Sequence, residues 1–206
     1  MTSGHLALSG SAITGTSHAH RIRRGIAYCS DDRKLDGMFP DKPVYQNLSS
    51  PWLPSVSRAG WLLRHQERAR AARHASEFTI DTRRLTSAVG VLSGGNQQKI
   101  ALGKWLGIDP KVLLVEEPTR GVDVGARSEI YARLRELSDL GTAVLVVSSD
   151  TAELHGLCDR IGTFYRGVMT QLRTSAAWTE DELVLEVMHN RDEVTAMSQT
   201  GEVRPL

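Results

Sequence analysis

Two groups of residues in this chain have the types and spacing needed to handle a phosphorylated ligand. Ser93, Gly94 and Gly95 form one group, and the pair Glu116 and Glu117 forms the other. A serine hydroxyl and glycine amides at a helix start can hold a phosphate, because free N–H groups and the helix dipole favour an anion. Two adjacent carboxylates can bind a metal ion and polarise a water molecule. Together the groups predict nucleotide chemistry at a shared surface.

Both groups lie at the ends of predicted elements. Residues 92–108 predict a helix that Ser93 caps, since its hydroxyl can accept from free backbone N–H groups. Pro110 ends this helix, because the residue before a proline disfavours helical backbone. The continuous apolar run 112–115 predicts a strand buried on both faces, and the two acids close that strand.

Helices alternate with apolar strands over the middle of the chain, which predicts an α/β fold with parallel core strands. We expect a helix at 125–140, ended by Gly141, and a second fully buried strand at 143–147. An Ala- and Arg-rich helix at 58–78 belongs to a helical insert. The proline- and serine-rich stretch 40–57 predicts an irregular connection.

The last quarter of the chain predicts a hairpin and one further helix. Residues 161–165 and 168–172 form the two arms of the expected hairpin. Thr179 and Glu182 have the spacing of a capping box, which opens a helix. The polar residues 190–206 predict a flexible C-terminal tail.

Composition limits the function classes. The chain has 206 residues, 40% of them hydrophobic and 24% charged, which is ordinary for a soluble globular protein. A net charge of +1 provides no global field for nucleic acid or anionic lipid. Cys29 and Cys158 predict free thiols in a reducing compartment. With no long apolar run and no signal-peptide pattern, the sequence predicts a cytoplasmic chain.

One expected motif is missing. No segment matches G-x-x-x-x-G-K-[ST], the loop that cradles nucleotide phosphates. The only Gly-Lys pair, Gly103 and Lys104, is followed by Trp105 instead of a serine or threonine. The sequence therefore carries only part of the residues that nucleotide hydrolysis requires.

The amino-acid sequences of several segments resemble those of the ATP-binding cassette (ABC) ATPases, which energise membrane transport. The most similar group is the second cassette of the double-cassette subunits of bacterial importers for ribose, galactose, arabinose or xylose. The resemblance covers about residues 3–169 and rests on Gly25-Ile26-Ala27-Tyr28, Asp32-Arg33-Lys34 with Asp36-Gly37, LSGGNQQK, EPTRGVDVGA and Val146-Val147-Ser148-Ser149.

The resemblance implies a truncated P-loop NTPase fold of the ABC type. A partial nucleotide-binding domain would occupy residues 1–189, with a helical subdomain near 48–105 and the tail after it. In the family, the phosphate loop with its strand and helix precedes the region that corresponds to Thr2. We therefore expect an uncovered apolar face on the sheet and no ATP hydrolysis by this chain alone. A start codon assigned too late, or the remnant of a broken gene, is the plain alternative.

The resemblance also assigns roles to the two groups. Ser93, Gly94 and Gly95, with Gln97, correspond to the signature motif, which contacts the γ-phosphate of ATP held by the opposite cassette. Glu117 corresponds to the general base for the attacking water. Glu116 stands where the family has an aspartate that assists Mg²⁺. The extra methylene of Glu116 moves the carboxylate oxygens, and Mg²⁺ tolerates little geometric error.

Three further residues correspond to nucleotide-binding positions of the family. Asp123 corresponds to the D-loop, Asp31 to the Q-loop glutamine, and Ser149 to the histidine that touches the γ-phosphate. Plain structural readings remain open beside these roles. Ser93 could be an ordinary helix cap, the two acids a solvated strand end, and Arg120 with Asp123 a helix-start ion pair and cap.

The implied function is that of an ATP-binding subunit that couples ATP binding and hydrolysis to carbohydrate import. Its cofactors would be ATP and Mg²⁺. Its partners would be another ABC nucleotide-binding domain, the membrane permease and, indirectly, an extracytoplasmic sugar-binding protein, with no nucleic acid. The chain would lie in the cytoplasm, peripherally at the inner face of the cell membrane. The alternative is a non-hydrolysing structural or regulatory partner that supplies the signature motif to another cassette.

Overall fold

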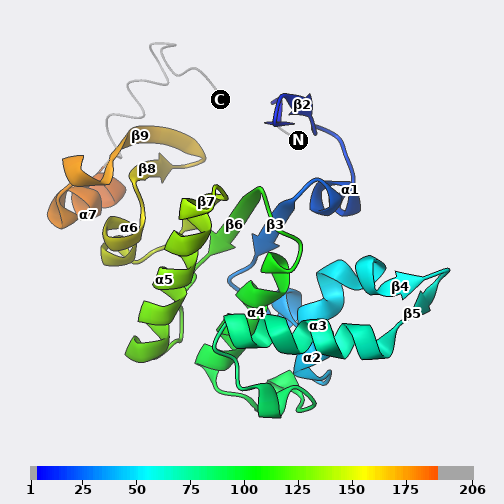
Figure 1. Cartoon of the computed structure of the whole chain (residues 1–206). Helices are drawn as coiled ribbons and strands as arrows, with labels where there is room; N and C mark the ends of the chain where they lie inside the picture. Colours follow the sequence, from blue (N-terminus) through cyan, green and yellow to red (C-terminus); the bar gives the residue numbers. More distant parts are fainter. Residues whose placement is uncertain (1–3, 190–206) are drawn as a thin grey trace. The chain divides into compact units, whose positions relative to one another are not determined.

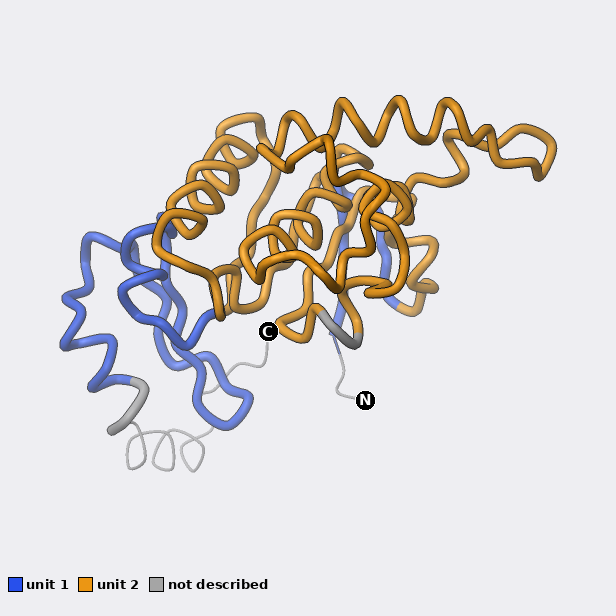
Figure 2. Tube along the Cα trace, turned by 90° about the horizontal axis from the view of Figure 1, so that it is seen from below, with its two compact units in different colours: residues 1–14, 148–206 blue, residues 15–147 orange. Residues whose placement is uncertain are grey.

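The computed structural model describes residues 4–189, except the side chains of residues 34, 35 and 187–189. The chain divides into two compact units, coloured separately in Figure 2. Unit 1 consists of Met1–Thr14 and Ser148–Leu206, and unit 2 of Gly15–Val147. The predicted tail at 190–206 lies outside the described residues.

Unit 2 contains a three-stranded parallel sheet in the order β3-β6-β7, visible near the centre of Figure 1. β6 (Val112–Glu116) lies between β3 (Ile26–Cys29) and β7 (Ala143–Val147), and both neighbours run parallel to it. Leu113 and Val115 on one face of β6 are buried, whereas Val112 and Leu114 on the other face are only half-buried. The predicted parallel strand is confirmed, but its full burial on both faces is not. Because the strands are parallel, their carboxyl ends meet at one edge of the sheet.

β7 is less buried than its sequence predicts. The prediction of a second fully buried strand at 143–147 is wrong, because Leu145 is 59% exposed and Val147 is 56% exposed. Among the described residues β7 pairs only with β6, so it is an edge strand with apolar side chains open to solvent.

Helices surround this sheet within unit 2. None of the helices in the described part of the chain combines the length and apolar character needed to cross a bilayer. The helical segments of unit 2 are α1 (His18–Arg23), the π-helical turn η1 (Arg33–Gly37), α2 (Val44–Ser49), η2 (Ser50–Val56), α3 (Arg64–Glu77), η3 (Thr82–Arg84), η4 (Val89–Val91), α4 (Gly94–Leu106) and α5 (Val124–Asp139).

The predicted helix at 58–78 begins six residues later than expected, at Arg64. The preceding residues form a short antiparallel hairpin of β4 (Ser57–Arg58) and β5 (Trp61–Leu62). Ala59 and Gly60 between the strands both have positive φ, 50° and 83°, as a two-residue hairpin turn requires. This turn outweighs the helix propensity of the surrounding residues.

The predicted irregular connection at 40–57 is also wrong, because α2 and η2 occupy most of it. Asn47 holds the start of this region: its side chain accepts from the Phe39 N–H at 2.7 Å and donates to the Phe39 carbonyl at 3.0 Å. Val44 and Leu48 are fully buried. Tertiary burial of these apolar side chains therefore overrides the local proline content.

The described part of unit 1 contains two hairpins, two α-helices and a short 3-10 helix. Its packed core consists of Ile161, Trp178 and Leu183. The predicted capping box is confirmed, because the Thr179 N–H donates to Glu182 Oε2 at 2.9 Å and the Glu182 N–H donates to Thr179 Oγ1 at 3.2 Å. The elements are β1 (Ala7–Leu8), β2 (Ser11–Ala12), α6 (Thr151–Leu157), β8 (Arg160–Tyr165), β9 (Val168–Thr174), η5 (Ser175–Ala177) and α7 (Glu180–His189).

Candidate functional site

The acidic pair lies at the carboxyl end of β6. Glu116 is the last residue of the strand, and Glu117 has a φ of 45°, in the left-handed region that costs a non-glycine residue about 1–2 kcal/mol. Two backbone hydrogen bonds hold this conformation: the Glu117 N–H donates to the Val147 carbonyl at 2.8 Å, and the Glu117 carbonyl accepts from the Arg120 N–H at 3.2 Å. The chain thus turns sharply out of the sheet at Glu117.

Tyr28 of β3 holds one oxygen of Glu116. Its hydroxyl donates to Glu116 Oε2 at 2.8 Å. This hydrogen bond, followed by partial desolvation, raises the pKa of Tyr28 above its ordinary value, since ionisation would place two anions together. Sequence reasoning missed Tyr28. The signal that could have found it is the parallel register, which pairs Tyr28 with Leu114, two residues before Glu116.

The signature segment opens α4 as predicted. Ser93 is the N-cap, and its Oγ accepts from the Asn96 N–H at 3.5 Å and from Asn96 Nδ2 at 3.0 Å. The side chain of Ser93 is exposed at this helix start. A hydroxyl that accepts these bonds keeps its own O–H available to donate. The capping role and a phosphate-binding role of Ser93 are therefore compatible.

Gly94 and Gly95 lie against the loop that follows β6. A Cβ on Gly94 would lie 2.9 Å from the Gly121 carbonyl oxygen. A Cβ on Gly95 would lie 3.0 Å from Ala126 Cβ and 3.3 Å from Asp123 Oδ2. Only residues without a side chain allow this approach. The two glycines thus bring the signature segment and the acidic loop together.

Asp123 is the N-cap of α5, where its Oδ1 accepts from the Ala126 N–H at 3.0 Å. The capping interpretation of Asp123 is therefore confirmed. Arg120, which was expected to pair with Asp123, instead pairs with Asp31, whose Oδ2 lies 3.2 Å from Arg120 Nη1. Asp31, which follows β3, is thereby linked to the loop after β6.

Arg33 joins three parts of the site and was not singled out by sequence reasoning. Its Nη1 donates to Gln98 Oε1 of α4 at 2.9 Å and to the Arg120 carbonyl at 3.0 Å. Its Nη2 would lie 3.2 Å from a Cβ on Gly94. Because η1, α4 and the loop after β6 all meet at Arg33, this side chain fixes their relative positions. Its partners lie 65 and 87 residues away in the sequence, so local sequence does not reveal this role.

Two further predicted nucleotide-binding residues, Gln97 and Ser149, belong to different units. Gln97 is buried, and its Nε2 donates to the carbonyls of Val89 and Leu92 at 3.3 and 3.1 Å. Its amide nitrogen thus supports the turn that precedes α4. Ser149 belongs to unit 1, where it is exposed and directly precedes Asp150, the N-cap of α6.

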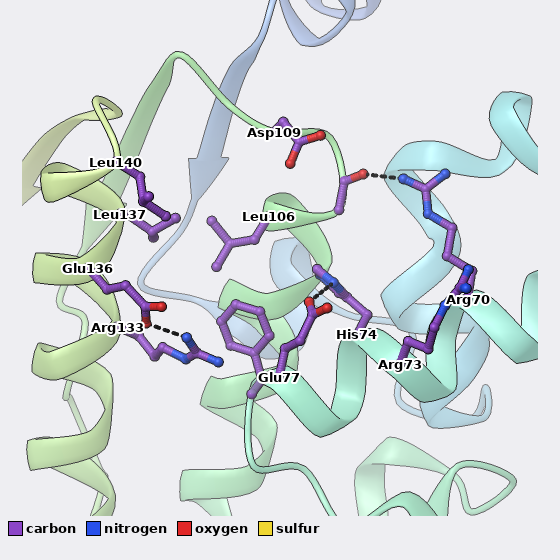
Figure 3. Close-up of a pocket in the computed structure, with 12 residues that line it drawn as sticks. Arg70, Arg73, His74, Glu77, Leu106, Asp109, Arg133, Glu136, Leu137 and Leu140 are labelled. Carbon is purple, nitrogen blue, oxygen red and sulfur yellow. Dashed lines mark hydrogen bonds and ion pairs between the residues drawn. The ribbon is translucent and has the colours of Figure 1, made fainter.

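The chain also has a cleft of about 440 Å³ between α3, α5 and the end of α4, which Figure 3 shows. None of the predicted site residues lines it. Arg133 forms an ion pair with Glu136, and His74 Nδ1 lies 3.2 Å from Glu77 Oε2. Arg70 donates to the Gly107 carbonyl at 2.8 Å. These contacts tie the helices together, and we assign no ligand to this cleft.

The carboxylate oxygens near Glu116 could bind a magnesium ion only if a phosphate ligand supplied further oxygens. No group of three or more His, Cys, Asp or Glu side chains within residues 4–189 is arranged to hold a metal ion. Mg²⁺ commonly takes one or two carboxylates and completes its shell with phosphate oxygens and water. Glu116 has one carboxylate oxygen outside its bond with Tyr28, so it suits one position of such a shell.

The sequence is similar to transporter proteins. Residues 1–120 match the ABC transporter family. The chain is 37% identical over 182 residues to the ribose import ATP-binding protein RbsA 1 of Agrobacterium fabrum, covering 88% of this chain and 36% of that protein. It is 41% identical over 184 residues to the arabinose import ATP-binding protein AraG 2 of Burkholderia thailandensis, covering 89% and 35%. It therefore spans little more than a third of these relatives.

Solved structures establish the fold. A nucleotide-free ATP-binding cassette from an ABC transporter superposes with a TM-score of 0.73 at 18% identity, covering 93% of this chain and 76% of that one. A dimeric cassette in a post-hydrolysis state, bound to ADP and Pi, gives a TM-score of 0.71 at 20% identity, covering 84% and 74%. The predicted α/β fold of the P-loop NTPase class is confirmed. The chain belongs to the ABC transporter family.

Proposed function

We propose that this chain is part of the ATP-binding subunit of a carbohydrate importer. The observation that carries the proposal is the packing of Gly94 and Gly95 against the loop after Glu117, with the exposed Ser93 hydroxyl at the N-terminus of α4. The named import functions of the relatives support sugars as the cargo. Those functions belong to proteins about three times as long as this chain, which covers 36% and 35% of them.

In this proposal the start of α4 binds the terminal phosphate of ATP. The free N–H groups of the first helical turn favour an anion. The Ser93 hydroxyl accepts from Asn96 and donates its proton to a phosphate oxygen. Gln97 would not touch the phosphate. Its side chain stabilises the turn before α4 by donating to the carbonyls of Val89 and Leu92. Gly94 and Gly95 allow the helix start to stay in contact with the acidic loop.

Glu117 would act as the general base, and Glu116 would provide one ligand to Mg²⁺. Bound Mg²⁺ would neutralise phosphate charge during hydrolysis. Tyr28 fixes the orientation of the Glu116 carboxylate. Asp123 and Asp31 hold the surrounding loops, Asp123 as a cap and Asp31 through Arg120. Ser149 would contribute a hydrogen bond to the γ-phosphate, as its correspondence to the family histidine implies.

The nucleotide contacted by Ser93 would be held by another cassette. The 206 residues contain no G-x-x-x-x-G-K-[ST] segment to grip phosphates from the same chain. We therefore propose that this chain alone does not hydrolyse ATP. The same observation favours the second candidate function, a non-hydrolysing partner that completes the site of another cassette.

The further partners follow from an import function. They are a second nucleotide-binding domain, the membrane permease and, through the permease, an extracytoplasmic sugar-binding protein. The chain would then lie at the cytoplasmic face of the membrane, held there peripherally. A net charge of +1 is consistent with the absence of a nucleic-acid partner.

Mixing experiments test the proposal. The chain is added to an intact ATP-binding cassette of the ribose-import type that carries its own phosphate loop, and phosphate release is measured. Addition should stimulate hydrolysis, and Ser93→Arg should abolish the stimulation because the bulky cation fills the phosphate position. Ser138→Arg, at another exposed serine near the far end of α5, is the matched control and should retain it.

Two outcomes contradict parts of this proposal. Absence of any stimulation by the folded wild-type chain would rule out completion of a site in trans. ATP turnover by the chain alone, abolished by Glu117→Gln, would overturn the proposed inactivity while supporting Glu117 as the base.

A further inference from the structure

The β4–β5 hairpin carries an exposed tryptophan that the fold does not use. Trp61 is 80% exposed, and Leu62 beside it is 38% exposed. Arg58 pairs with Trp61 across the two strands, so both side chains lie on one face of the hairpin. Figure 1 shows β4 and β5 projecting from the end of α3, away from β3, β6 and β7. Trp61 thus contributes little to the core of unit 2.

The segment that follows this tip is predominantly positively charged. From Arg58 to Ser76 the sequence contains five arginines and a single acidic residue, Glu67. Glu67 is buried and accepts a hydrogen bond from the Ser49 hydroxyl at 2.6 Å, so it neutralises nothing at the surface. The chain as a whole is nearly neutral, and this segment therefore concentrates positive charge locally.

Four of these arginines are exposed, and none of the four forms an ion pair with a carboxylate within residues 4–189. They are Arg58, Arg64, Arg68 and Arg73. The fifth, Arg70, is engaged with Ser55, Gly107 and the ring of Trp52. Arg68 stacks on the Tyr45 ring, whereas Arg58, Arg64 and Arg73 remain available to an anionic partner.

We propose that the basic hairpin surface, formed by Arg58, Trp61 and Arg64, docks on an anionic phospholipid membrane. Tryptophan favours the boundary between lipid headgroups and acyl chains, because its ring is apolar and its N–H is polar. Arginines near a membrane surface are attracted by lipid phosphates and anionic headgroups. A projecting tip suits a shallow insertion into this boundary, whereas small ligands prefer concave sites. This docking does not depend on sugar transport.

Tryptophan fluorescence of the full chain reports on this docking selectively. The chain has four tryptophans, and the other three, Trp52, Trp105 and Trp178, are buried. Vesicles of phosphatidylcholine with phosphatidylglycerol should shield Trp61 from the neutral quencher acrylamide. Brominated acyl chains in those vesicles should quench Trp61. The Trp61→Phe variant should lose both responses while keeping its fold, since the side chain is exposed.

Charge variants separate electrostatic docking from unspecific adsorption. Arg58→Gln and Arg64→Gln should each weaken vesicle partitioning about five-fold, as expected for a single cation near an anionic surface. Arg83→Gln, at an exposed arginine already paired with Asp81, should change it little. Leu140→Ala is the control for removal of an exposed apolar side chain. Raising the salt concentration should weaken binding of the wild type.

Three results would overturn the proposal. The first is equal binding to vesicles of pure phosphatidylcholine. The second is full acrylamide access to Trp61 at saturating anionic vesicles, which would show that the hairpin tip does not insert into the membrane and would favour a protein partner. The third is a loss of binding in Arg83→Gln as large as in Arg58→Gln. Each can occur whether or not the chain stimulates ATP hydrolysis by another cassette, so the two proposals fail independently.

Discussion

The Tyr28 hydroxyl donates a hydrogen bond to Glu116 Oε2 at 2.8 Å, which joins β3 to the acidic end of β6. A residue from one strand thereby orients the carboxylate of the next, at the edge where parallel strands end. The neighbouring contacts of Arg33 and of Gly94 bring α4 to the same loop. The candidate site is thus held by side chains and backbone from three separate stretches of sequence.

Removal of the Tyr28 hydroxyl should loosen Glu116. Tyr28→Phe should lower the free energy of unfolding by about 0.5–1 kcal/mol, at the small end for a hydrogen bond because the pair is partly exposed. Urea denaturation measures this change. If the effect comes from this bond, Tyr28→Phe should add little further destabilisation in a Glu116→Ala background, which has no side-chain acceptor. Full additivity of the two changes would contradict it.

The same bond predicts the alkaline behaviour of Tyr28. Its pKa is raised in the folded state, so the neutral phenol stabilises the fold at pH values below the ordinary pKa near 10. That contribution is lost as the pH rises through the folded-state pKa. Ultraviolet titration of the wild type, minus Tyr28→Phe, should show a tyrosine that ionises above pH 10. Ionisation of Tyr28 at or below pH 10 would contradict the assignment.

Cys29 should be chemically inert in the folded chain. Burial raises the pKa of the Cys29 thiol from 9.0 to about 11. Cys158 is only partly buried. In a Cys158→Ser variant, Cys29 should react with a disulfide reagent at pH 8 only after denaturant is added. Rapid labelling without denaturant would show that β3 is accessible.

Gly94 should not tolerate a side chain. Gly94→Ala places Cβ 2.9 Å from the Gly121 carbonyl oxygen, so the loop must move, at a cost of about 1–3 kcal/mol. Gly156 of α6 is the matched control, because nothing lies within 4 Å of a Cβ there. Gly156→Ala should stabilise the chain by up to about 1 kcal/mol through helix propensity. Urea denaturation of both variants compares them directly.

Arg33 should hold the start of α4. Arg33→Ala removes a donor from the buried side chain of Gln98, and an unsatisfied buried acceptor costs about 1–3 kcal/mol. Hydrogen–deuterium exchange should rise in the first turn of α4 and in the loop around Arg120. Arg83→Ala, at an exposed arginine in η3, should leave both segments protected as in the wild type. Unchanged hydrogen–deuterium exchange in both segments of Arg33→Ala would contradict the bridging role of Arg33.

The local sequence was sufficient for features that depend on a few neighbouring residues. The cap at Ser93, the cap at Asp123 and the capping box of Thr179 and Glu182 follow from side chains that reach N–H groups within three residues. The parallel strand at 112–115 follows from its continuous apolar run, although only one of its faces is fully buried. The motif wording was sufficient to indicate the ABC family.

Tertiary structure decided what depends on distant partners. The exposure of Leu145 and Val147 depends on which strands pair with β7, and its apolar sequence cannot tell an edge strand from a central one. The bridge from Arg33 to Gln98 spans 65 residues, and that from Tyr28 to Glu116 spans 88. Such contacts are set by the packing of strands and helices, so local propensity and spacing alone determined the elements and their caps but not the contacts that assemble the site.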